Sequence, residues 1–312
     1  MKKIVITGAL GHIGSKLIRT LPIEIDDVEI IMIDNLLCQR YCSLFNLPKE
    51  YKYKFIEADI LDYDLNALFK DVLYVVHLAA ITNAAGSFGN EVEVENVNYI
   101  GTKKVIEACI KNNSKLIFLS TTSIYGTQKN VVDENCSVEE LQPQSPYAQS
   151  KFKSEQELEK YKEKLDYIIL RFGTIFGTSQ GMRFHTAVNK FCWQAVMNQP
   201  LTIWKTAYNQ KRPYLDLKDA VNSIAFIIKN DIFDKNIYNV LTKNLTVSDI
   251  VESIKQNVDS IDIDFVETKI MNQLSYDVSN EKFKKLGFKL QGNQYTAIKE
   301  TIDLLKVSSN YP

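Results

Sequence analysis

The sequence predicts an α/β protein with a Rossmann-type, doubly wound parallel sheet and a smaller, mixed α/β C-terminal lobe. Short apolar runs alternate with helical patterns through the first half, a glycine-containing turn follows the first run, and the rhythm breaks after Arg171. Such alternation is typical of parallel strands joined by crossover helices. We expect a nucleotide-binding domain over residues 1–172, rejoined by about 212–240, and a substrate lobe formed by 173–211 and 241–312.

The first apolar run, residues 4–6, leads into a turn with Gly-x-x-Gly-x-x-Gly spacing. Gly8 allows the sharp turn, Gly11 removes a side chain that would hold a diphosphate away, and Gly14 lets the next helix pack closely. The free N–H groups of that helix then face the phosphates. The spacing is one residue looser than the usual dinucleotide fingerprint, and an ordinary surface turn is the alternative.

A second apolar run, residues 29–33, favours the dinucleotide interpretation because it ends in Asp34. An acid at this position holds the ribose hydroxyls of adenosine. The same carboxylate would repel a 2′-phosphate, so we expect NAD and not NADP.

The following apolar runs are interpreted as strands of the same sheet. They cover residues 53–56, 72–78, 116–119 and 167–170, and long helical patterns cover 92–111 and 145–164. The second helix opens at Ser145-Pro146, a typical start signal.

Two positions along these strands carry open alternatives. Asp59-Ile60, just after the third strand, could meet an adenine ring, or Asp59 could be a simple turn residue. His77 is interpreted as a packed core histidine, with a catalytic role as the alternative, and the small residues of Leu78-Ala79-Ala80 would let a cofactor lie against the backbone.

Beyond Arg171 the pattern changes character. Residues 172–181 are rich in Gly and Thr, 182–198 form an amphipathic helical pattern, and 201–204 form a short strand. A helix resumes at Leu217, and short mixed elements follow from Ile237. We expect this second lobe to close over the carboxyl edge of the sheet, the usual ligand site of open α/β folds.

Composition excludes several classes of function. The chain has 37 basic and 38 acidic residues, a net charge of −1 and no long block of one sign, so we expect neither nucleic acid nor a membrane surface as partner. Five cysteines without metal-ligand spacing are interpreted as reduced thiols, and no metal is expected. No run approaches the ~20 apolar residues of a membrane span, and strand residues begin at once. We therefore expect a soluble, cytoplasmic protein.

A second group of residues carries the chemistry. Tyr147 and Lys151 are four apart on the predicted 145–164 helix, so they share one face. A nearby ammonium favours phenolate and is expected to lower the pKa of Tyr147 from about 10. Thr121, at the end of the fifth strand, could hydrogen-bond the reacting oxygen of a substrate alcohol. The same Tyr-x-x-x-Lys spacing is common on solvated helices, and only its combination with the nucleotide turn makes it specific.

In this combination the sequence resembles the extended short-chain dehydrogenase/reductase family, in its nucleotide-sugar epimerase/dehydratase branch. The resemblance covers almost the whole chain. The segments that match the family's motifs are TGALGHIGS, IDNL, HLAA, NVNYIGT, STTSIYG, SPYAQSK and LRFGTIFG. The resemblance implies Tyr147 as the proton-transferring phenol, Lys151 as its partner and nicotinamide-ribose ligand, and Thr121 as the third catalytic residue.

The resemblance also implies NAD as the cofactor and a set of residues around it. That set comprises Gly8, Gly11, His12, Ile13, Gly14, Asp34, Asn35, Asp59, Ile60, Leu78, Ala79, Ala80, Asn98, Ser120, Tyr147 and Lys151.

Substrate positions follow from the same resemblance. Arg212 falls where the family meets a sugar-nucleotide diphosphate, Arg183 and Asn189 where it contacts phosphate and uracil, and Thr121 at the sugar. Thr174 stands where many UDP-hexose epimerases have Asn, which leaves the sugar open. For Arg183 and Arg212 the alternative is a surface ion pair.

The expected activity is NAD-dependent 4-epimerisation of a UDP-hexose through a keto sugar. In related dehydratases an Asp-Glu pair follows the threonine, whereas this chain has Thr122-Ser123. A dehydratase or reductase, and a non-catalytic NAD-binding protein, are the alternatives. We also expect a homodimer through the two long helices. The first helix has more apolar positions than one buried face needs, namely Ile100, Val105, Ile106 and Ile110.

Overall fold

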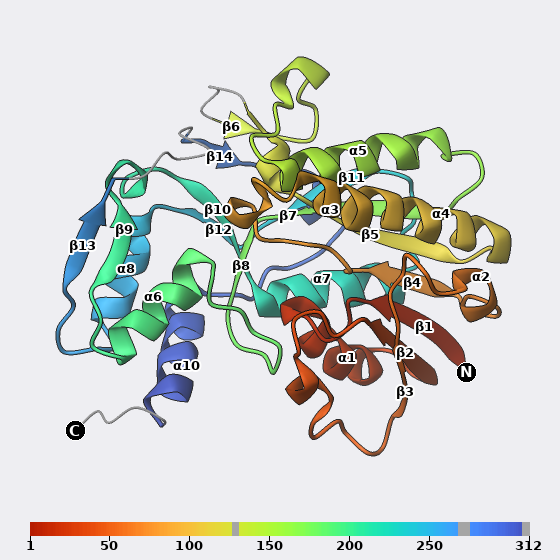
Figure 1. Ribbon diagram of the computed structural model, residues 1–312, viewed down its shortest axis with the longest axis horizontal. Coiled ribbons are helices and arrows are strands. Elements are labelled where there is room, and N and C mark those ends of the chain that lie inside the picture. The colour runs from red at the N-terminus through yellow and green to blue at the C-terminus, as the bar shows by residue number, and fades with distance from the viewer. Residues whose placement is uncertain (127–130, 268–274, 308–312) are drawn as a thin grey trace.

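The computed structural model describes residues 1–126, 131–267 and 275–307. Its centre is a seven-stranded sheet in the order β11-β7-β5-β4-β1-β2-β3, with every neighbouring pair parallel (Figure 1). Its strands are β1 (Lys2–Thr7), β2 (Val28–Asp34), β3 (Lys52–Glu57), β4 (Tyr74–His77), β5 (Lys115–Thr121), β7 (Tyr167–Phe172) and β11 (Ile237–Val240). The predicted Rossmann-type sheet is confirmed, and its strand order reverses between β1 and β4.

Helices cover both faces of this sheet. Figure 1 shows α3, α4 and α5 on one face and α1 and α7 on the other. The helices that surround the seven-stranded sheet are α1 (His12–Glu24), α2 (Leu65–Leu68), α3 (Glu91–Glu95), α4 (Gly101–Asn112), α5 (Pro146–Lys160) and α7 (Leu217–Lys229).

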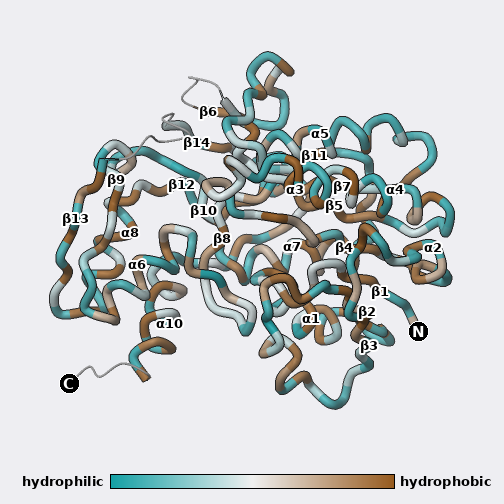
Figure 2. The backbone as a smooth tube through the Cα atoms, in the orientation of Figure 1, coloured by the Kyte–Doolittle hydropathy of each residue, from teal (hydrophilic) through white to brown (hydrophobic). Residues whose placement is uncertain are grey.

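The strands are buried on both sides, which explains their continuous apolar runs. In β1, Ile4 and Ile6 pack into the core that α1 and α7 cover, whereas Val5 packs into the opposite core with Val105 of α4. Successive side chains of a strand point to opposite faces, so one short run supplies both cores. In Figure 2 hydrophobic and hydrophilic stretches alternate along the helices, as expected for helices with one buried side.

The smaller lobe contains short mixed sheets and its own apolar core. Strands β12 (Lys243–Leu245), β10 (Arg212–Asp216) and β8 (Thr174–Phe176) form one sheet, in which β10 is antiparallel to β12 and parallel to β8. Two further pairs join β13 (Ile263–Val266) to β9 (Leu201–Trp204) and β14 (Asp277–Val278) to β6 (Val131–Val132). The helices of this lobe are α6 (Ala187–Val196), α8 (Val247–Lys255) and α10 (Gln294–Lys306), whereas α9 (Glu281–Lys284) packs against the main core.

Four features depart in detail from the expected pattern. The segment from Arg212 begins in the small sheet, and the chain returns to the main layer only with α7 and β11. Phe283 and Phe288, late in the chain, pack into the main core. The 92–111 helix contains a π-helical turn at Asn96–Ile100. The expected 182–198 helix is shorter, because it starts at Ala187.

The described residues contain neither a membrane-spanning helix nor a metal-binding cluster. No helix there is long and apolar enough to cross a membrane. No cluster of His, Cys, Asp or Glu in that part of the chain could hold a metal ion. The five cysteines are free thiols.

Candidate active site

The glycine turn after β1 forms the floor of a cleft at the carboxyl ends of the strands. Gly8 has a φ of +65°, and a Cβ there would lie 2.6 Å from the backbone N of Ala79. A Cβ on Gly14 would lie 2.5 Å from the carbonyl oxygen of Ala9. Both positions therefore require glycine, the first for the turn and for contact with the end of β4, the second for the close start of α1.

Asp34 ends β2 beside this turn, as predicted. Its Oδ2 accepts from the N–H of Leu10 at 3.0 Å and its Oδ1 from the N–H of Leu36 at 2.9 Å. These bonds hold an acceptor-only carboxylate at the edge of the cleft, where paired ribose hydroxyls could donate to it.

Asp59 is a turn residue that also faces the cleft. Its Oδ1 accepts from the N–H of Leu61 at 2.8 Å, as a turn residue does, and it lines the cleft. Asn35 also lines the cleft and donates to Oδ2 of Asp59 at 2.8 Å. An adenine contact by Asp59 or its neighbour Ile60 stays a prediction.

His77 is a core residue, as expected. It is fully buried, and its ring nitrogens lie 2.7 Å from Oγ1 of Thr7 and 2.9 Å from Oγ1 of Thr102. Burial lowers the pKa of His77 to about 3. The residues after it, Leu78, Ala79 and Ala80, line the cleft.

Asn98 has a supporting position and does not line the cleft. This fully buried amide accepts from the N–H of Ile81 at 2.8 Å and donates to the carbonyl of Ile81 and to Ser150 Oγ, each at 3.0 Å. Asn98 thus fixes the cleft wall at Ile81 and joins it to α5, and its contact with the cofactor stays a prediction.

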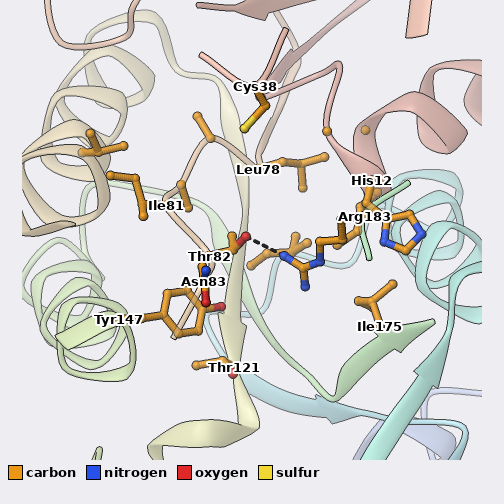
Figure 3. Close-up of a pocket in the computed structure, with 18 of the residues that line it drawn as sticks. His12, Cys38, Leu78, Ile81, Thr82, Asn83, Thr121, Tyr147, Ile175 and Arg183 are labelled. Atoms are coloured by element: carbon orange, nitrogen blue, oxygen red, sulfur yellow. Dashed lines mark hydrogen bonds between the residues drawn. The ribbon is translucent and has the colours of Figure 1, made fainter. Parts of the chain in front are cut away.

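Thr121, Tyr147 and Lys151 meet at the middle of the cleft. Tyr147 and Lys151 lie on one face of α5, whose N-cap is Ser145, and Thr121 ends β5 opposite them. The hydroxyls of Thr121 and Tyr147 share a hydrogen bond, and Figure 3 shows both side chains at the cleft. The expected juxtaposition is therefore present.

The electrostatics of Tyr147 differ from expectation. Burial raises the pKa of Tyr147, and the groups that oppose this rise are the positive charge of Arg183 and the Thr121 hydrogen bond. Burial lowers the pKa of Lys151 to about 8, with Glu155 opposing the change. The Nζ of Lys151 lies 4.8 Å from the centre of the Phe118 ring. Arg183 is thus a cation that favours the Tyr147 phenolate in this structure, and the predicted effect of Lys151 on the phenol stays a prediction.

Arg183 reaches into the cleft from the segment between β8 and α6. It donates to Oγ1 of Thr82, and its Nε is buried without a partner (Figure 3). Asn189, on α6, supports this segment: it donates to the carbonyl of Arg183 at 2.9 Å and accepts from the N–H of Gly177 at 3.2 Å. Asn189 is fully buried and lines neither cavity, so the structure shows a structural role for it, and a substrate contact stays a prediction.

A second cavity continues from the first. The first has a volume of about 410 Å³ and the second about 340 Å³. The residues that line both are Ala84, Ser123, Thr174, His185 and Trp204.

The second cavity is basic. Arg212 and Lys190 line it, and no Asp or Glu of the described residues does. The guanidinium of Arg212 lies 5.7 Å from the centre of the Tyr276 ring and donates to Gln210 Oε1 at 3.0 Å. A cavity with this charge suits an anionic ligand, and Arg212 is where a diphosphate was expected.

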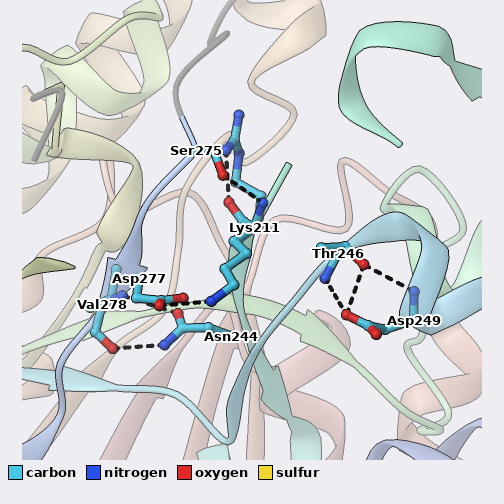
Figure 4. A network of polar contacts seen from close by, with 8 residues as sticks. Lys211, Asn244, Thr246, Asp249, Ser275, Asp277 and Val278 are labelled. Carbon is cyan, nitrogen blue, oxygen red and sulfur yellow. Dashed lines mark hydrogen bonds and ion pairs between the residues drawn. The ribbon is translucent and has the colours of Figure 1, made fainter. Parts of the chain in front are cut away.

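The segment that carries Tyr276 is fixed against β10 and β12. Figure 4 shows the ion pair of Lys211 with Asp277, at 2.9 Å, and the paired hydrogen bonds between Asn244 and Val278, at 3.0 Å. These contacts hold one wall of the second cavity in place.

The cleft also contains buried polar atoms without hydrogen-bond partners, which a bound dinucleotide could satisfy. His12 Nδ1, Ser120 Oγ and Arg183 Nε are buried without hydrogen-bond partners, and all three residues line the cleft. Buried polar atoms are normally paired, so their gathering here indicates ligand contacts. His12 and Ile13, at the start of α1, line the cleft as expected.

Several cavity residues escaped the sequence interpretation, among them Arg40, His185, Lys190 and Trp204. Trp204 ends a strand that was predicted, so its aromatic side chain was a usable signal. Arg40 lies in a loop and His185 before a helix, and no local pattern marks either residue.

Comparisons with known proteins agree with this geometry. The model of the NAD dependent epimerase/dehydratase family matches residues 4–240. A trifunctional UDP-glucose 4,6-dehydratase/UDP-4-keto-6-deoxy-D-glucose 3,5-epimerase/UDP-4-keto-L-rhamnose-reductase from Arabidopsis thaliana is 31% identical over 97% of this chain and 47% of its own length. This chain therefore spans about half the length of that relative. The uncharacterized UDP-glucose epimerase YtcB of Bacillus subtilis is 32% identical over 72% of each chain.

Solved structures show the same fold over nearly the whole chain. A UDP-N-acetylglucosamine 4-epimerase from Methanobrevibacter ruminantium has a TM-score of 0.84 and 28% identity, covering 97% of each chain. A UDP-glucuronic acid 4-epimerase variant from Bacillus cereus, bound to NAD and a fluorinated UDP-sugar, has a TM-score of 0.88 and 25% identity, covering 98% of this chain and 99% of that one.

Proposed function

Because the chain belongs to the NAD-dependent epimerase/dehydratase family, whose cofactor is NAD, we propose that it inverts C4 of a UDP-hexose. The observation that carries this proposal is the placement of Thr121 and Tyr147 in the cofactor cleft, which adjoins a basic second cavity through shared residues such as Ser123. Bound NAD would take a hydride from the sugar and return it. The protein has to hold the sugar, move one proton and keep the diphosphate in place.

Tyr147 is the group that moves the proton. Its phenolate would accept the proton of the C4 hydroxyl, helped by the charge of Arg183 and by the Thr121 hydroxyl. Thr121 would orient the same sugar oxygen. After the keto sugar turns and the hydride is returned to the opposite face of C4, Tyr147 would return the proton to the C4 oxygen. Lys151, beside it on α5, would hold the nicotinamide ribose.

Arg212 and Lys190 would retain the substrate diphosphate while the sugar turns. Both line the second cavity, and an arginine fork suits a diphosphate. The shared region at Thr174 and Ser123 offers hydroxyl groups and no carboxylate among the described residues. This lining also suits an acidic sugar such as UDP-glucuronic acid.

Dehydration is disfavoured by the same lining. Removal of water after oxidation at C4 needs a base for the C5 proton and an acid for the leaving C6 oxygen. Thr122 and Ser123 cannot supply either at neutral pH. Burial lowers the pKa of His185 to about 4, with nearby Arg183 adding to the effect, so His185 is a poor proton donor there.

The first test is the absorbance of the purified protein as UDP-sugars are added. An epimerase that holds NAD tightly should show partial reduction of the nicotinamide with its own substrate, and Tyr147→Phe should not. Binding of UDP-sugars without any reduction, in a protein shown to contain NAD, would instead support a non-catalytic role.

A further inference from the structure

Arg40 lies over the glycine turn although no sequence pattern points to it. It belongs to the loop after β2 and lines the cofactor cleft. A Cβ added to Gly11 would lie 3.9 Å from Nη1 of Arg40. The guanidinium is therefore close to the N-terminus of α1, which begins at His12.

The loop that carries Arg40 is fixed to this helix start. The N–H of Ser43 donates to the carbonyl of Arg40 at 3.0 Å, and Oγ of Ser43 donates to the carbonyl of Leu10 at 2.8 Å. Cys42 donates to the carbonyl of Gln180 at 3.3 Å. Arg40 is thus held beside the turn from two sides.

The charge of Arg40 is uncompensated. In the described part of the chain its guanidinium has neither a hydrogen-bond partner nor an ion-pair partner. Asp34, in the same cleft, is occupied by two backbone N–H groups and forms no ion pair with Arg40. Burial and nearby Arg183 lower the pKa of His12 to about 3, and Arg40 adds to this effect. Arg40 and Arg183 thus both act on His12 at the start of α1, and Arg40 forms no ion pair with a carboxylate of the described residues.

We propose that Arg40 binds the diphosphate of NAD, opposite the N–H groups at the start of α1. A diphosphate is the anion that this cofactor brings to a helix N-terminus, and a guanidinium can bind it through two hydrogen bonds. The substrate diphosphate is the alternative source of the same chemistry. The position favours the cofactor, because Arg40 lines the first cavity and not the second.

The test is calorimetric titration of nucleotide-free protein with adenosine, ADP-ribose and UDP. For Arg40→Met we expect ADP-ribose affinity to fall about tenfold to a hundredfold, the range for a lost hydrogen bond to a charged group. Adenosine and UDP affinities should stay unchanged. Arg40→Lys should recover part of the loss, because the charge remains without the planar fork.

Lys16→Met is the matched control, because it removes one positive charge from α1 outside the cleft and should leave ADP-ribose binding intact. A second readout is the NAD that stays on the protein through gel filtration at rising salt, which should be released earlier from Arg40→Met.

Three results would overturn the proposal. Unchanged ADP-ribose affinity would leave Arg40 without a role in binding. An equal loss of adenosine would show that Arg40 only shapes the loop. A loss confined to UDP would assign it to the substrate. Each is distinguishable from failure of the proposed epimerisation, because none of these titrations involves turnover.

Discussion

Tyr147 lies in an environment that resists its ionisation, with two neighbours that favour it. Burial raises the pKa of this phenol, so the charge of Arg183 and the Thr121 hydrogen bond must offset the cost before it can accept a proton. We predict that Tyr147→Phe lowers kcat by about two to four orders of magnitude, the range for a positioned acid–base group. Cofactor content should be unchanged. A variant that keeps most of its activity would place the proton transfer elsewhere.

Asp34 is expected to select NAD over NADP. Its carboxylate is fixed beside the glycine turn by the N–H groups of Leu10 and Leu36, so it cannot easily turn away from a 2′-phosphate. We predict that Asp34→Ala weakens NAD binding and reduces discrimination against NADP. Calorimetry with both cofactors checks this, and tighter NADP than NAD binding by the wild type would contradict the assignment of Asp34 to the ribose.

At the scale of elements, α5 is joined to β7 by a buried ion pair. Glu155, one turn after Lys151, accepts from Arg171 at 3.0 and 2.6 Å, and both side chains are buried. Loss of one partner leaves a buried charge unpaired, so we predict that Glu155→Gln lowers the free energy of unfolding by about 3–5 kcal/mol. The control is Glu252→Gln, because Glu252 forms an exposed ion pair with Lys255. This substitution should change the free energy of unfolding by under about 1 kcal/mol. Urea unfolding of both variants would decide; equal effects would contradict the prediction.

Homodimerisation through α3, α4 and α5 stays a prediction, but fewer exposed apolar residues support it than the sequence suggested. Val105 and Ile106 are fully buried in the chain's own core, so they offer nothing to a partner. Val92 and Ile100 are exposed, at 77% and 37%. We predict a dimer in light scattering at micromolar concentration and a monomer for Val92→Glu with Ile100→Glu. A monomeric wild type would end this idea.

The elements that could be predicted are those whose pattern is local. The glycine turn, the strand ending in Asp34 and the four-residue spacing of Tyr147 and Lys151 each follow from short-range geometry. The helix expected from Met182 starts at Ala187, and the residue before Met182 makes a long-range contact that the local sequence does not record: a Cβ on Gly181 would lie 2.3 Å from the carbonyl oxygen of Leu10.

Long-range contacts also determine the positions of single residues in the site, so these positions could not be predicted from the sequence. The loop of Arg40 is fixed by a bond from Ser43 to Leu10, and Asn189 is turned inward by Gly177 and Arg183. Nothing in the local sequence records these pairings, so the sequence placed Asn189 at the substrate and gave Arg40 no role.

At the scale of the whole molecule, burial of neutral histidines makes stability depend on pH. Burial lowers the pKa of both His12 and His77 to about 3, with the charge of Arg183 contributing at His12 and that of Lys151 at His77. The unfolded chain, with pKa values of about 6.5, therefore binds more protons between pH 6.5 and 3. The free energy of unfolding therefore has its full value above pH 6.5 and falls as the pH decreases through this window.

We predict that each of these two histidines costs about 2 kcal/mol of folding free energy at pH 5 relative to pH 7. Urea unfolding across this range measures the slope. His77→Gln, which cannot titrate, should have a shallower slope than the wild type. A wild-type profile that is flat between pH 7 and 5 would contradict the burial argument.

The reaction itself depends on the whole molecule, because the main layer supplies Tyr147 and the cofactor cleft while the small lobe supplies Arg212 and the second cavity. The most direct measurement is chromatography with mass spectrometry after incubation with UDP-glucose, UDP-N-acetylglucosamine, UDP-glucuronic acid and dTDP-glucose. C4 epimerisation predicts, for at least one UDP-sugar, a product of unchanged mass that elutes as the C4 epimer and is absent with Tyr147→Phe. A product lighter by one water would contradict this account in favour of dehydration.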